Sequence, residues 1–357
     1  MYLVAVNLIA FPERFCENEM IRIFIDMPVE KAFVEKLCKI PDISLDIVEN
    51  YEEKQKTYPV NRIKDVDILF CTLVPENFSD MKKLRLIQIS SSGYSQLFGL
   101  GLVEKGIRAC NARGVFDIPI AEWNICMMVN LARNLRSMIR NQENGIWERN
   151  SQYQNEIRGK IVGLWGYGGI ARETARIASI MGMKIYALTT DGKIKPRHNI
   201  YCVPGTGDPE GKYPERVFSL MQQDEFLSDI EFLILCMPLT KNTEGIIGER
   251  QLRTLPLGTF LLNPARGPLV VEQALIRVLQ DGHLGGVALD AHYYYPMPPD
   301  HPLWKFPNVI MTPHISGSTL SPHFLERVWN IFYENVLRYI EKKPLLNELT
   351  PFQLNGQ

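Results

Sequence analysis

The sequence predicts an α/β protein built from two parallel-sheet domains. Short apolar runs of strand length alternate with helical stretches along most of the chain. One of these runs, residues 161–165, turns on glycines directly into a helix. The length agrees, because 357 residues are many for one core and suit two domains of ordinary size.

The expected elements follow from hydrophobic spacing. Runs of strand length occupy residues 21–25, 66–71, 86–89, 161–165, 184–188, 232–236, 258–263, 286–289 and 309–312. Helical spacing covers residues 29–40, 118–140, 170–181 and 322–341. We expect the last helix to pack back on the first domain, since the glycine-containing unit has its own sheet. The polar segment 189–224 is expected to form a surface loop.

Composition excludes several classes of protein. A net charge of −1 leaves no basic face for nucleic acid, and 46% hydrophobic with 22% charged residues are typical of a globular chain. No run has the length of a membrane span, and the apolar segment 1–10 lacks the basic start of a signal peptide. A cytoplasmic location is therefore expected. Seven cysteines without C-x-x-C spacing indicate neither a disulfide framework nor a metal site.

The glycine turn carries the first indication of chemistry. It reads Gly-Tyr-Gly-Gly-Ile-Ala, which fits G-x-G-x-x-A between a strand and a helix. Gly166 permits the tight turn, Gly168 lets the backbone approach a pyrophosphate, and Ala171 keeps the helix close to the strand. The phosphates would meet unpaired N–H groups at the positive end of the helix, at Gly169 and Ile170. The alternative is an ordinary glycine-rich turn.

Two polar residues that follow strand-length runs suit nicotinamide chemistry, which needs a group to polarise the substrate and a proton donor. Arg266 follows the run 258–263, and its planar fork suits a carboxylate or a developing alkoxide. His314 follows the run 309–312, and an imidazole can give and take a proton near neutral pH. Each has a structural alternative: Arg266 as a surface helix cap, and His314 as a purely structural histidine.

A loop of small residues follows the run 86–89. It contains Ser92, Gly93 and Tyr94 and lies at the end of a strand, where open α/β sheets place ligands. Composition alone would equally fit a plain turn.

Several segments resemble the signatures of the D-isomer-specific 2-hydroxyacid dehydrogenases. Besides the glycine turn they are residues 107–111, 120–122, 237–243, 262–267, 285–290 and 312–317, which read IRACN, IAE, MPLTKNT, LNPARG, GGVALD and TPHISG. The resemblance covers residues 68–339. It implies a flavodoxin-like substrate domain, residues 1–117 plus 317–357, around a continuous Rossmann domain, residues 118–316, with the substrate cleft between them.

The resemblance also implies roles for individual residues. Arg266 would bind and polarise a 2-oxo acid, His314 would be the proton donor and acceptor, and the backbone N–H groups of Ser92, Gly93 and Tyr94 would hold the substrate carboxylate. Asp290 and Ser316 would lie against the nicotinamide. The other residues assigned to the cofactor are Gly166, Gly168, Gly169, Ile170, Ala171, Thr189, Thr190, Pro238, Thr243, Ala265 and Gly317. A homodimer formed through residues 118–150 is implied as well, although an apolar helix alone would equally fit an internal interface.

One departure from the family pattern concerns catalysis. Tyr295 stands where most relatives carry the glutamate that orients the catalytic histidine, so we place Tyr295 in the catalytic set. A nearby anion raises the pKa of an imidazole, and a tyrosine supplies no such charge. We therefore predict that the activity supported by His314 falls off at lower pH than in relatives with the glutamate. Formate dehydrogenases also lack this glutamate, so its absence does not abolish hydride chemistry.

A second departure concerns the cofactor. NAD-specific members carry an acid at the end of the second strand of the dinucleotide unit, and here that position is Thr189. Lys193, Lys195 and Arg197 follow closely, while Asp191 could still reach the ribose. NAD and NADP both remain open, and the absence of an arginine directly after Thr189 slightly favours NAD.

The sequence thus predicts an oxidoreductase that transfers hydride between NAD(P)H and the C2 carbonyl of a small 2-oxo acid, giving a D-2-hydroxy acid in a reversible reaction. The rival hypothesis is a dinucleotide-binding regulatory or sensor protein that has lost turnover together with the glutamate. The presence of both Arg266 and His314 argues against the rival.

Overall fold

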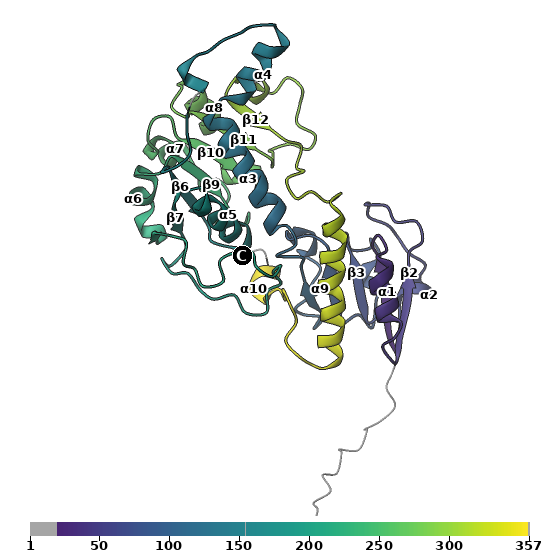
Figure 1. Ribbon diagram of the computed structural model, residues 1–357. Helices are drawn as coiled ribbons and strands as arrows, with labels where there is room; N and C mark the ends of the chain where they lie inside the picture. Colours follow the sequence, from purple (N-terminus) through teal and green to yellow (C-terminus); the bar gives the residue numbers. More distant parts are fainter. Residues whose placement is uncertain (1–19, 154, 356–357) are drawn as a thin grey trace, which may run out of the picture.

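The structure is a computed structural model that describes residues 20–153 and 155–355. Figure 1 shows two lobes, and each holds one β-sheet. All pairs of neighbouring strands in both sheets are parallel. The predicted class, α/β with two parallel-sheet domains, is therefore confirmed. The apolar segment 1–10 lies outside the described residues.

The first domain is built on a five-stranded sheet in the flavodoxin-like order β2-β1-β3-β4-β5. Its strands are β1 (Ile21–Asp26), β2 (Ile43–Ile47), β3 (Ile68–Cys71), β4 (Leu86–Ile89) and β5 (Arg108–Cys110). Its helices are α1 (Lys31–Leu37), α2 (Val60–Ile63), α9 (Pro322–Ile340) and α10 (Pro351–Leu354). All residues of β3 and β4 are buried, as expected for parallel strands covered on both faces.

Helix α9 packs on this sheet although it comes near the end of the chain. The ring of Phe332 stacks on the ring of Phe70 in β3 with 4.1 Å between the centroids, and Trp329 meets Phe70 edge-on at 5.2 Å. The indole of Trp329 also donates a hydrogen bond to the carbonyl of Pro28. The prediction that the last helix returns to the first domain is confirmed, and Figure 1 shows α9 beside β3 and α1.

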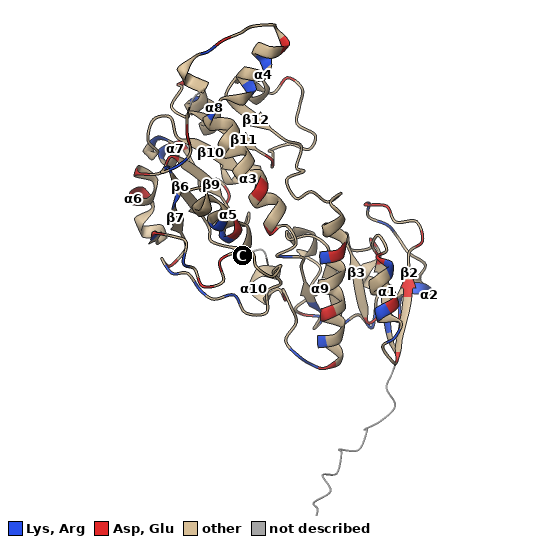
Figure 2. Ribbon diagram, viewed as in Figure 1, with Lys and Arg blue, Asp and Glu red and all other residues tan. Residues whose placement is uncertain are grey.

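The second domain is built on a seven-stranded sheet in the order β12-β11-β10-β9-β6-β7-β8. Its strands are β6 (Ile161–Trp165), β7 (Lys184–Leu188), β8 (Arg216–Phe218), β9 (Phe232–Leu235), β10 (Phe260–Asn263), β11 (Gly286–Leu289) and β12 (Val309–Met311). Its helices are α3 (Asp117–Ala132), α4 (Leu135–Glu143), α5 (Gly169–Ile180), α6 (Gln223–Ser228), α7 (Glu249–Thr254) and α8 (Glu272–Gln280). The central strands β6, β9, β10 and β11 carry no charged residue (Figure 2).

The strand order reverses between β6 and β9, and this point positions the site. Strand β6 pairs with β7 on one side and with β9 on the other. Open parallel sheets bind ligands at the carboxyl ends of their strands, at such a switch point. The glycine turn directly follows β6, so it lies at this point.

The predicted helix over residues 118–140 is wrong in one respect, because the structure divides it. Helix α3 ends at Ala132 and α4 begins at Leu135. Between them Asn134 has a φ of 48°, a left-handed conformation that asparagine tolerates better than most residues and that interrupts the helix.

We name residues 189–215 the strap, because this segment between β7 and β8 runs along one side of the second domain and reaches the first. The expectation of a plain surface loop is wrong for its second half, where Asp208 is 1% exposed. The hydroxyl of Tyr167 donates to the Asp208 carboxylate at 2.7 Å. The guanidinium of Arg172 in α5 donates to the carbonyl of Lys195 at 2.7 Å. The strap is therefore packed against the glycine turn and α5.

The strap is also bonded to the first domain. The backbone N–H of Asn347 donates to the carbonyl of Asn199 at 2.8 Å, and the N–H of Tyr201 donates to the side-chain oxygen of Asn347 at 3.1 Å. Tyr201 further packs so closely on Gly114 that a Cβ at this glycine would overlap the Tyr201 carbonyl oxygen. The strap therefore links the two domains beside the site.

Candidate active site

The residues predicted for the site all lie just beyond the carboxyl ends of strands. The loop 92–94 follows β4 in the first domain, whereas the glycine turn follows β6, Arg266 follows β10, Asp290 follows β11 and His314 follows β12 in the second. Since parallel strands end at the same edge of a sheet, the side chains from β6, β10, β11 and β12 share one edge.

Arg266 is held by the strand that precedes it. Asn263, the last residue of β10, is 1% exposed, and its side-chain oxygen accepts the backbone N–H groups of Ala265 at 3.1 Å and Arg266 at 3.2 Å. Its amide nitrogen donates to the Arg266 carbonyl at 2.7 Å. The backbone of Gly267 then packs on His292, where a Cβ would overlap the His292 carbonyl. These contacts fix the backbone from which the Arg266 side chain extends.

The guanidinium of Arg266 reaches across to the first domain. A Cβ built on Gly93 would lie 2.5 Å from Nη2 of Arg266, so the guanidinium rests on the Gly93 backbone. The two residues are far apart in the sequence and come from different sheets. The structure therefore brings together the predicted polarising group and the loop predicted to hold the substrate carboxylate.

The loop around Gly93 is itself fixed by the segment that follows β5. The side-chain amide of Asn111 donates to the Ser92 carbonyl at 2.7 Å, and the backbone N–H of Ala112 donates to the Ser91 carbonyl at 2.9 Å. The Ser91 hydroxyl donates to the Gly93 carbonyl at 2.7 Å. With these groups engaged, the loop is a preformed element rather than a free turn.

His314 lies on a turn that is organised by Asp290. The Asp290 carboxylate is fully buried and accepts the backbone N–H groups of Ile315 at 2.9 Å and Ser316 at 3.0 Å. It also accepts the hydroxyl groups of Ser316 and Thr312. Both carboxylate oxygens are thus used by the turn. A contact of Asp290 or Ser316 with a nicotinamide stays a prediction.

The environment of His314 disfavours the imidazolium. Burial is the main cause that lowers the pKa of His314 below 6.5, and the positive charge of Arg266 and the neighbouring His292 lower it further, while Asp290 acts in the opposite direction. Arg266 and His314 follow strands β10 and β12 at the same edge of one sheet. That the two side chains meet at a bound substrate stays a prediction.

Tyr295 packs on His314 but its hydroxyl points elsewhere. The two rings have 5.6 Å between their centroids at an angle of 52°. The Tyr295 hydroxyl instead accepts the backbone N–H of His292 at 3.2 Å. Within residues 20–153 and 155–355 no hydrogen bond joins Tyr295 to the imidazole of His314. Tyr295 therefore contributes a ring contact where the family glutamate would contribute a charge.

The glycine turn has the form that a dinucleotide needs. Gly166 has a φ of 94°, and a Cβ there would lie 2.8 Å from the Cys236 carbonyl oxygen. At Gly168, by contrast, a Cβ would meet nothing within 4 Å. That open space lies where α5 begins, so a pyrophosphate could approach the backbone at the positive end of the helix. Gly169 is covered by the carboxylate of Asp117.

Charged side chains surround this helix end. Asp117 is 8% exposed, and burial raises the pKa of its carboxyl group, while Arg197 at 3.6 Å acts in the opposite direction. Nη2 of Arg197 is buried and has no hydrogen-bond partner within the described part of the chain. An unpaired guanidinium nitrogen beside open space at a helix N-terminus fits an anionic ligand such as a dinucleotide phosphate.

A cavity of about 390 Å³ continues from the glycine turn to the end of β7. Its lining comprises Tyr167, Gly168, Arg172, Thr189, Thr190, Asp191, Lys193, Ile194, Lys195, Pro196 and Arg197. Thr189 and Thr190 line this cavity, and their contact with an adenosine ribose stays a prediction. Asp191, however, is 2.6 Å from Nζ of Lys195, and its carboxylate also accepts the Lys193 N–H.

The other predicted cofactor residues lie on loops at the same sheet edge. The Thr243 hydroxyl donates to the Pro238 carbonyl at 2.7 Å, which closes the loop after β9. Gly317 packs on the ring of Phe116, with 3.0 Å from a Cβ position to that ring. Contact of these residues with a cofactor stays a prediction.

Sequence reasoning missed several residues that organise the site. Asn263 and His292 are hydrogen-bonded to the turns that carry Arg266 and His314, while Asp117 and Asn347 lie at the glycine turn and the strap. A polar residue at the end of a buried strand was the available signal for Asn263. Within residues 20–153 and 155–355, no cluster of His, Cys, Asp and Glu is arranged to hold a metal, and no helix has the length and apolarity to span a bilayer.

Comparison with known proteins decides the family. A family model described as "D-isomer specific 2-hydroxyacid dehydrogenase, NAD binding domain" matches residues 125–316. The chain belongs to the D-isomer specific 2-hydroxyacid dehydrogenase family. As a member it is an enzyme, an NAD(P)-dependent 2-hydroxyacid dehydrogenase, and the predicted family and enzyme class are confirmed.

Individual relatives of this dehydrogenase agree. It is 32% identical over 300 residues to a D-3-phosphoglycerate dehydrogenase of Dictyostelium discoideum, covering 81% of this chain and 67% of that protein. It is 28% identical over 306 residues to a glyoxylate reductase of Thermofilum pendens, covering 81% and 86%. The crystal structure of an NADPH-dependent glyoxylate/hydroxypyruvate reductase from Sinorhizobium meliloti shares the fold, with a TM-score of 0.72, 20% identity and coverage of 94% and 100%.

Proposed function

We propose that this dehydrogenase reduces a small 2-oxo acid to the D-2-hydroxy acid with a reduced nicotinamide dinucleotide, in a reversible reaction. The observation that carries the proposal is the contact of the Arg266 guanidinium with Gly93 of the opposite domain. A carboxylate held by the backbone N–H groups of Ser92, Gly93 and Tyr94 would place its adjacent carbonyl between Arg266 and His314.

Each group has a distinct task in this reaction. When bound, the reduced nicotinamide supplies hydride to the C2 carbonyl carbon. Arg266 binds the substrate and stabilises the negative charge that grows on the carbonyl oxygen. His314 donates the proton to that oxygen and takes it back in the reverse direction. Tyr295 covers one side of the His314 ring.

The proposal is tested with purified protein and a panel of 2-oxo acids, following the absorbance of NADH and NADPH. We expect turnover with at least one small acid, and chiral analysis should show the D-hydroxy acid. Arg266→Ala should lower kcat/KM by about 10³-fold, the usual cost of losing one charge-stabilising group. Tight dinucleotide binding without turnover of any acid would instead support the sensor hypothesis.

For the cofactor we propose a preference for NADPH. The cavity at the end of β7 is lined by four cations, Arg172, Lys193, Lys195 and Arg197, and by one carboxylate. That carboxylate, Asp191, is paired with Lys195, and this pairing leaves it poorly placed to hold a ribose hydroxyl. The surplus of positive charge favours a 2′-phosphate over the hydroxyl of NADH. It reverses the slight preference for NAD that the absence of an arginine directly after Thr189 suggested.

Lys193→Ala tests this preference by direct binding as well as by kinetics. We expect the Kd for NADPH to rise about tenfold, which corresponds to roughly 1.4 kcal/mol, with the Kd for NADH unchanged. Lys184→Ala, on an exposed residue at the start of β7, is the matched control. A wild-type enzyme that binds NADH as tightly as NADPH would contradict the proposal.

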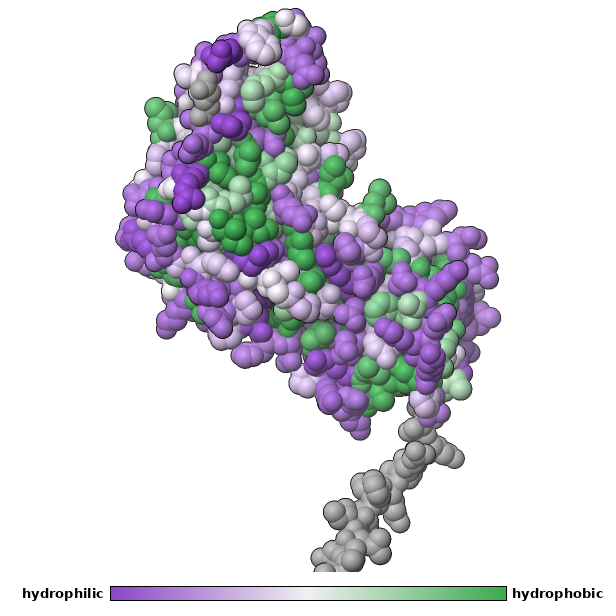
Figure 3. All heavy atoms as spheres, in the orientation of Figure 1, coloured by the Kyte–Doolittle hydropathy of each residue, from purple (hydrophilic) through white to green (hydrophobic). Residues whose placement is uncertain are grey.

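We propose a homodimer formed through α3, α4 and the arm 144–153. Trp147 on this arm is 90% exposed, and Ile146 and Ile139 are 54% and 48% exposed. In Figure 3 apolar residues gather over the middle of the second domain, where Figure 1 places α3. Large apolar side chains presented this way are typical of interfaces.

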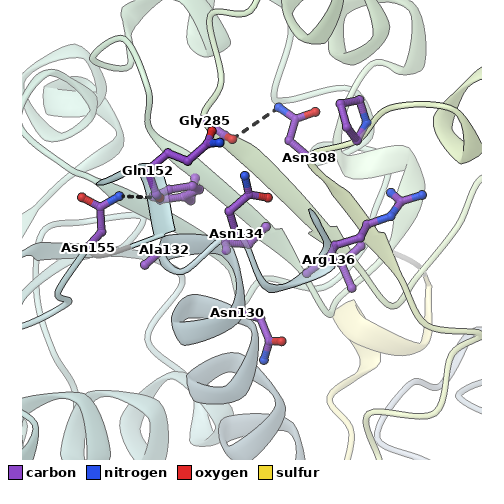
Figure 4. A pocket seen from close by; sticks show the side chains of 12 residues that line it. Asn130, Ala132, Asn134, Arg136, Gln152, Asn155, Gly285 and Asn308 are labelled. Carbon is purple, nitrogen blue, oxygen red and sulfur yellow. Dashed lines mark hydrogen bonds between the residues drawn. The ribbon is translucent and has the colours of Figure 1, made fainter. Parts of the chain in front are cut away.

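A small cavity lies at the base of the arm. It has about 180 Å³ and lies between the α3–α4 turn, the arm and the strand β12 (Figure 4). Arg136 is fixed beside it, donating to the Phe306 carbonyl at 2.7 Å. Trp147→Ser should convert a dimer into monomers in analytical ultracentrifugation, and a wild-type monomer would refute the proposal.

We also propose the domain boundaries 1–117 plus 317–357 and 118–316, and a cytoplasmic location. The boundaries are supported by α9, which shares a core with β1 and β3, and by α3, which packs on α5. Limited proteolysis that releases a fragment of residues 118–316 would support the boundaries, and cell fractionation would test the location.

A further inference from the structure

A second imidazole, His292, is buried directly behind the turn that carries His314. It comes two residues after Asp290 and is 7% exposed. Its Nε2 lies 2.7 Å from the Thr312 carbonyl oxygen. Because a carbonyl only accepts, Nε2 carries the proton, and Nδ1 is then an acceptor. Nδ1 is buried and has no hydrogen-bond partner within the described part of the chain.

The hydrogen bond from His292 is accepted by Thr312, which begins the turn that carries His314. The Thr312 carbonyl also accepts the backbone N–H of His314 at 2.9 Å. The imidazole of His292 and the main chain of His314 therefore share one oxygen. The Thr312 hydroxyl is fixed as well, since it accepts the indole N–H of Trp123 at 3.1 Å and donates to Asp290.

The turn needs this support because its backbone is strained. His314 has a φ of 57°, in the left-handed region, which costs a residue other than glycine about 1 kcal/mol or more. Such a conformation persists only where its surroundings hold it. Asp290 holds the turn after His314 through Ile315 and Ser316, and His292 holds it before His314 through Thr312.

The side chain of His314 receives no comparable support. Within residues 20–153 and 155–355 no hydrogen bond to its imidazole is present, and Tyr295 contributes only its ring. The hydroxyl of Tyr295 is instead bonded to the backbone N–H of His292. The direction of the His314 ring is therefore set through the backbone.

We propose that His292 is a positioning residue for His314, which it orients through the Thr312 carbonyl in place of a carboxylate acting on the ring itself. The proposal rests on the proposed function for its effect on turnover. Within residues 20–153 and 155–355 no hydrogen bond joins His292 to the Gly93 loop or to the Arg266 guanidinium, so we expect its side chain to affect the chemical step and not substrate binding.

The kinetic test compares His292→Phe with His292→Gln. Phenylalanine keeps a ring of similar size and removes the donor, whereas the glutamine amide can still donate to the Thr312 carbonyl. We expect H292F to lower kcat by about 10- to 100-fold, the cost of a small misplacement of a reacting group, with the substrate KM within about twofold. H292Q should keep kcat within about threefold.

A matched control exists elsewhere in the second domain. His283 also places its Nε2 on a backbone carbonyl, that of Leu255 at 3.0 Å, but before β11 and away from the carboxyl ends of the strands. His283→Phe should lower Tm and leave kcat unchanged. The H292F substitution also removes Nδ1, a buried nitrogen without a partner, which offsets part of the lost hydrogen bond. The Tm of H292F should therefore not fall as the Tm of H283F does. A purely structural role for His292 predicts the same behaviour for both variants.

A readout without turnover separates this proposal from the proposed function. The chain has six histidines, so the ring signals of His314 can be assigned by NMR with the variant His314→Asn. In the wild type and H292Q we expect one narrow set of signals. In H292F the signals should broaden or divide, because the direction of the His314 ring is no longer fixed through the Thr312 carbonyl.

The outcomes are distinct. If no 2-oxo acid is reduced, the proposed function fails while the NMR comparison still decides the role of His292. H292F with unchanged kcat and unchanged His314 signals would overturn the positioning role. So would an H292Q variant that is as impaired as H292F, or an effect confined to the substrate KM.

Discussion

The site depends on the absence of a side chain at Gly93, because the Arg266 guanidinium occupies the space that a Cβ would need. The Cβ position of Gly93 lies 2.5 Å from Nη2 of Arg266, a distance that no real pair of atoms of this kind adopts. Gly93→Ala should therefore displace the guanidinium and raise the substrate KM by about tenfold or more, with dinucleotide affinity unchanged. Steady-state kinetics and a dinucleotide titration check this.

The control for that variant is Gly248→Ala. A Cβ there meets its nearest atom at 3.4 Å, which is an ordinary contact, and the residue precedes α7. Gly248→Ala should leave the substrate KM and the dinucleotide Kd unchanged. A substrate KM that stays the same in Gly93→Ala would show that Arg266 does not bind the acid from its observed position.

The pH dependence of activity follows from the environment of His314. Reduction needs the imidazolium, and burial together with Arg266 lowers the pKa of His314 below 6.5. The rate of reduction should therefore fall as the pH rises through a value below 6.5, while the rate of oxidation, which needs the neutral ring, should rise through the same value.

Tyr295→Glu is the matching substitution. A carboxylate placed near the imidazole, where the Tyr295 ring now lies with its centroid 5.6 Å away, should raise the controlling pKa, because an anion favours the imidazolium. Tyr295→Gln, which adds no charge, should leave it where it is. A pH–rate profile with the same pKa in all three proteins would contradict the assignment of His314.

At the scale of residues, the sequence predicted that Arg266 and His314 follow strands, but not how their turns are held. Arg266 and His314 could be found because each follows a strand-length run, and strand ends meet at one edge of a parallel sheet. The orientation of the Tyr295 hydroxyl could not be found, since it depends on the rotamer that the packed loop allows. The role of His292 was hidden for the same reason.

The glycine turn allows a prediction at the scale of one element, because its glycines serve different purposes. Gly166→Ala forces a Cβ to within 2.8 Å of the Cys236 carbonyl at a positive φ, so it should destabilise the fold by about 2 kcal/mol or more. Gly168→Ala meets nothing within 4 Å, so it should leave Tm unchanged and weaken only dinucleotide binding.

Thermal unfolding measures the Tm of Gly166→Ala and Gly168→Ala, and a dinucleotide titration measures the Kd of each variant. Each variant serves as the control for the other, since both add one methyl group and the two positions are two residues apart. A Gly168→Ala protein that binds the dinucleotide normally would mean that the pyrophosphate does not approach this turn.

The three strands that sequence reasoning missed are short or only partly buried. Strands β5 and β8 have three residues each, too few for a periodic pattern, and the five residues of β2 are all only partly buried. Such strands are defined by pairing with a neighbour, which the sequence does not reveal. The uncharged strands β6 and β9 to β11 were found because burial on both faces demands apolar residues.

On the scale of the whole molecule, Asn347 joins the strap to the first domain. It is fully buried, and its side chain donates to the carbonyls of Asn111 and Arg113 at 3.1 and 2.8 Å while accepting from Tyr201. Asn347→Gly should destabilise the protein by about 2–4 kcal/mol, because buried polar groups lose their partners. The amide of Tyr201 should exchange its hydrogen faster.

Glycine is chosen at this position because Asn347 has a φ of 57°, which glycine adopts without strain. The effect measured is thus that of the side chain. The amide of Asn347 itself, which donates to the Asn199 carbonyl, serves as the internal reference. Unchanged exchange at Tyr201 would show that the strap is held by other contacts.

The return of α9 to the first sheet has a consequence for biosynthesis. Phe70 leaves the ribosome 262 residues before its stacking partner Phe332, the difference between positions 332 and 70. At the usual pace of translation that interval is roughly tens of seconds. Throughout it, one face of the first sheet lacks the cover of α9 while the second domain is being synthesised. The nascent chain therefore presents an uncovered apolar face for chaperones to shield until α9 packs on the first sheet.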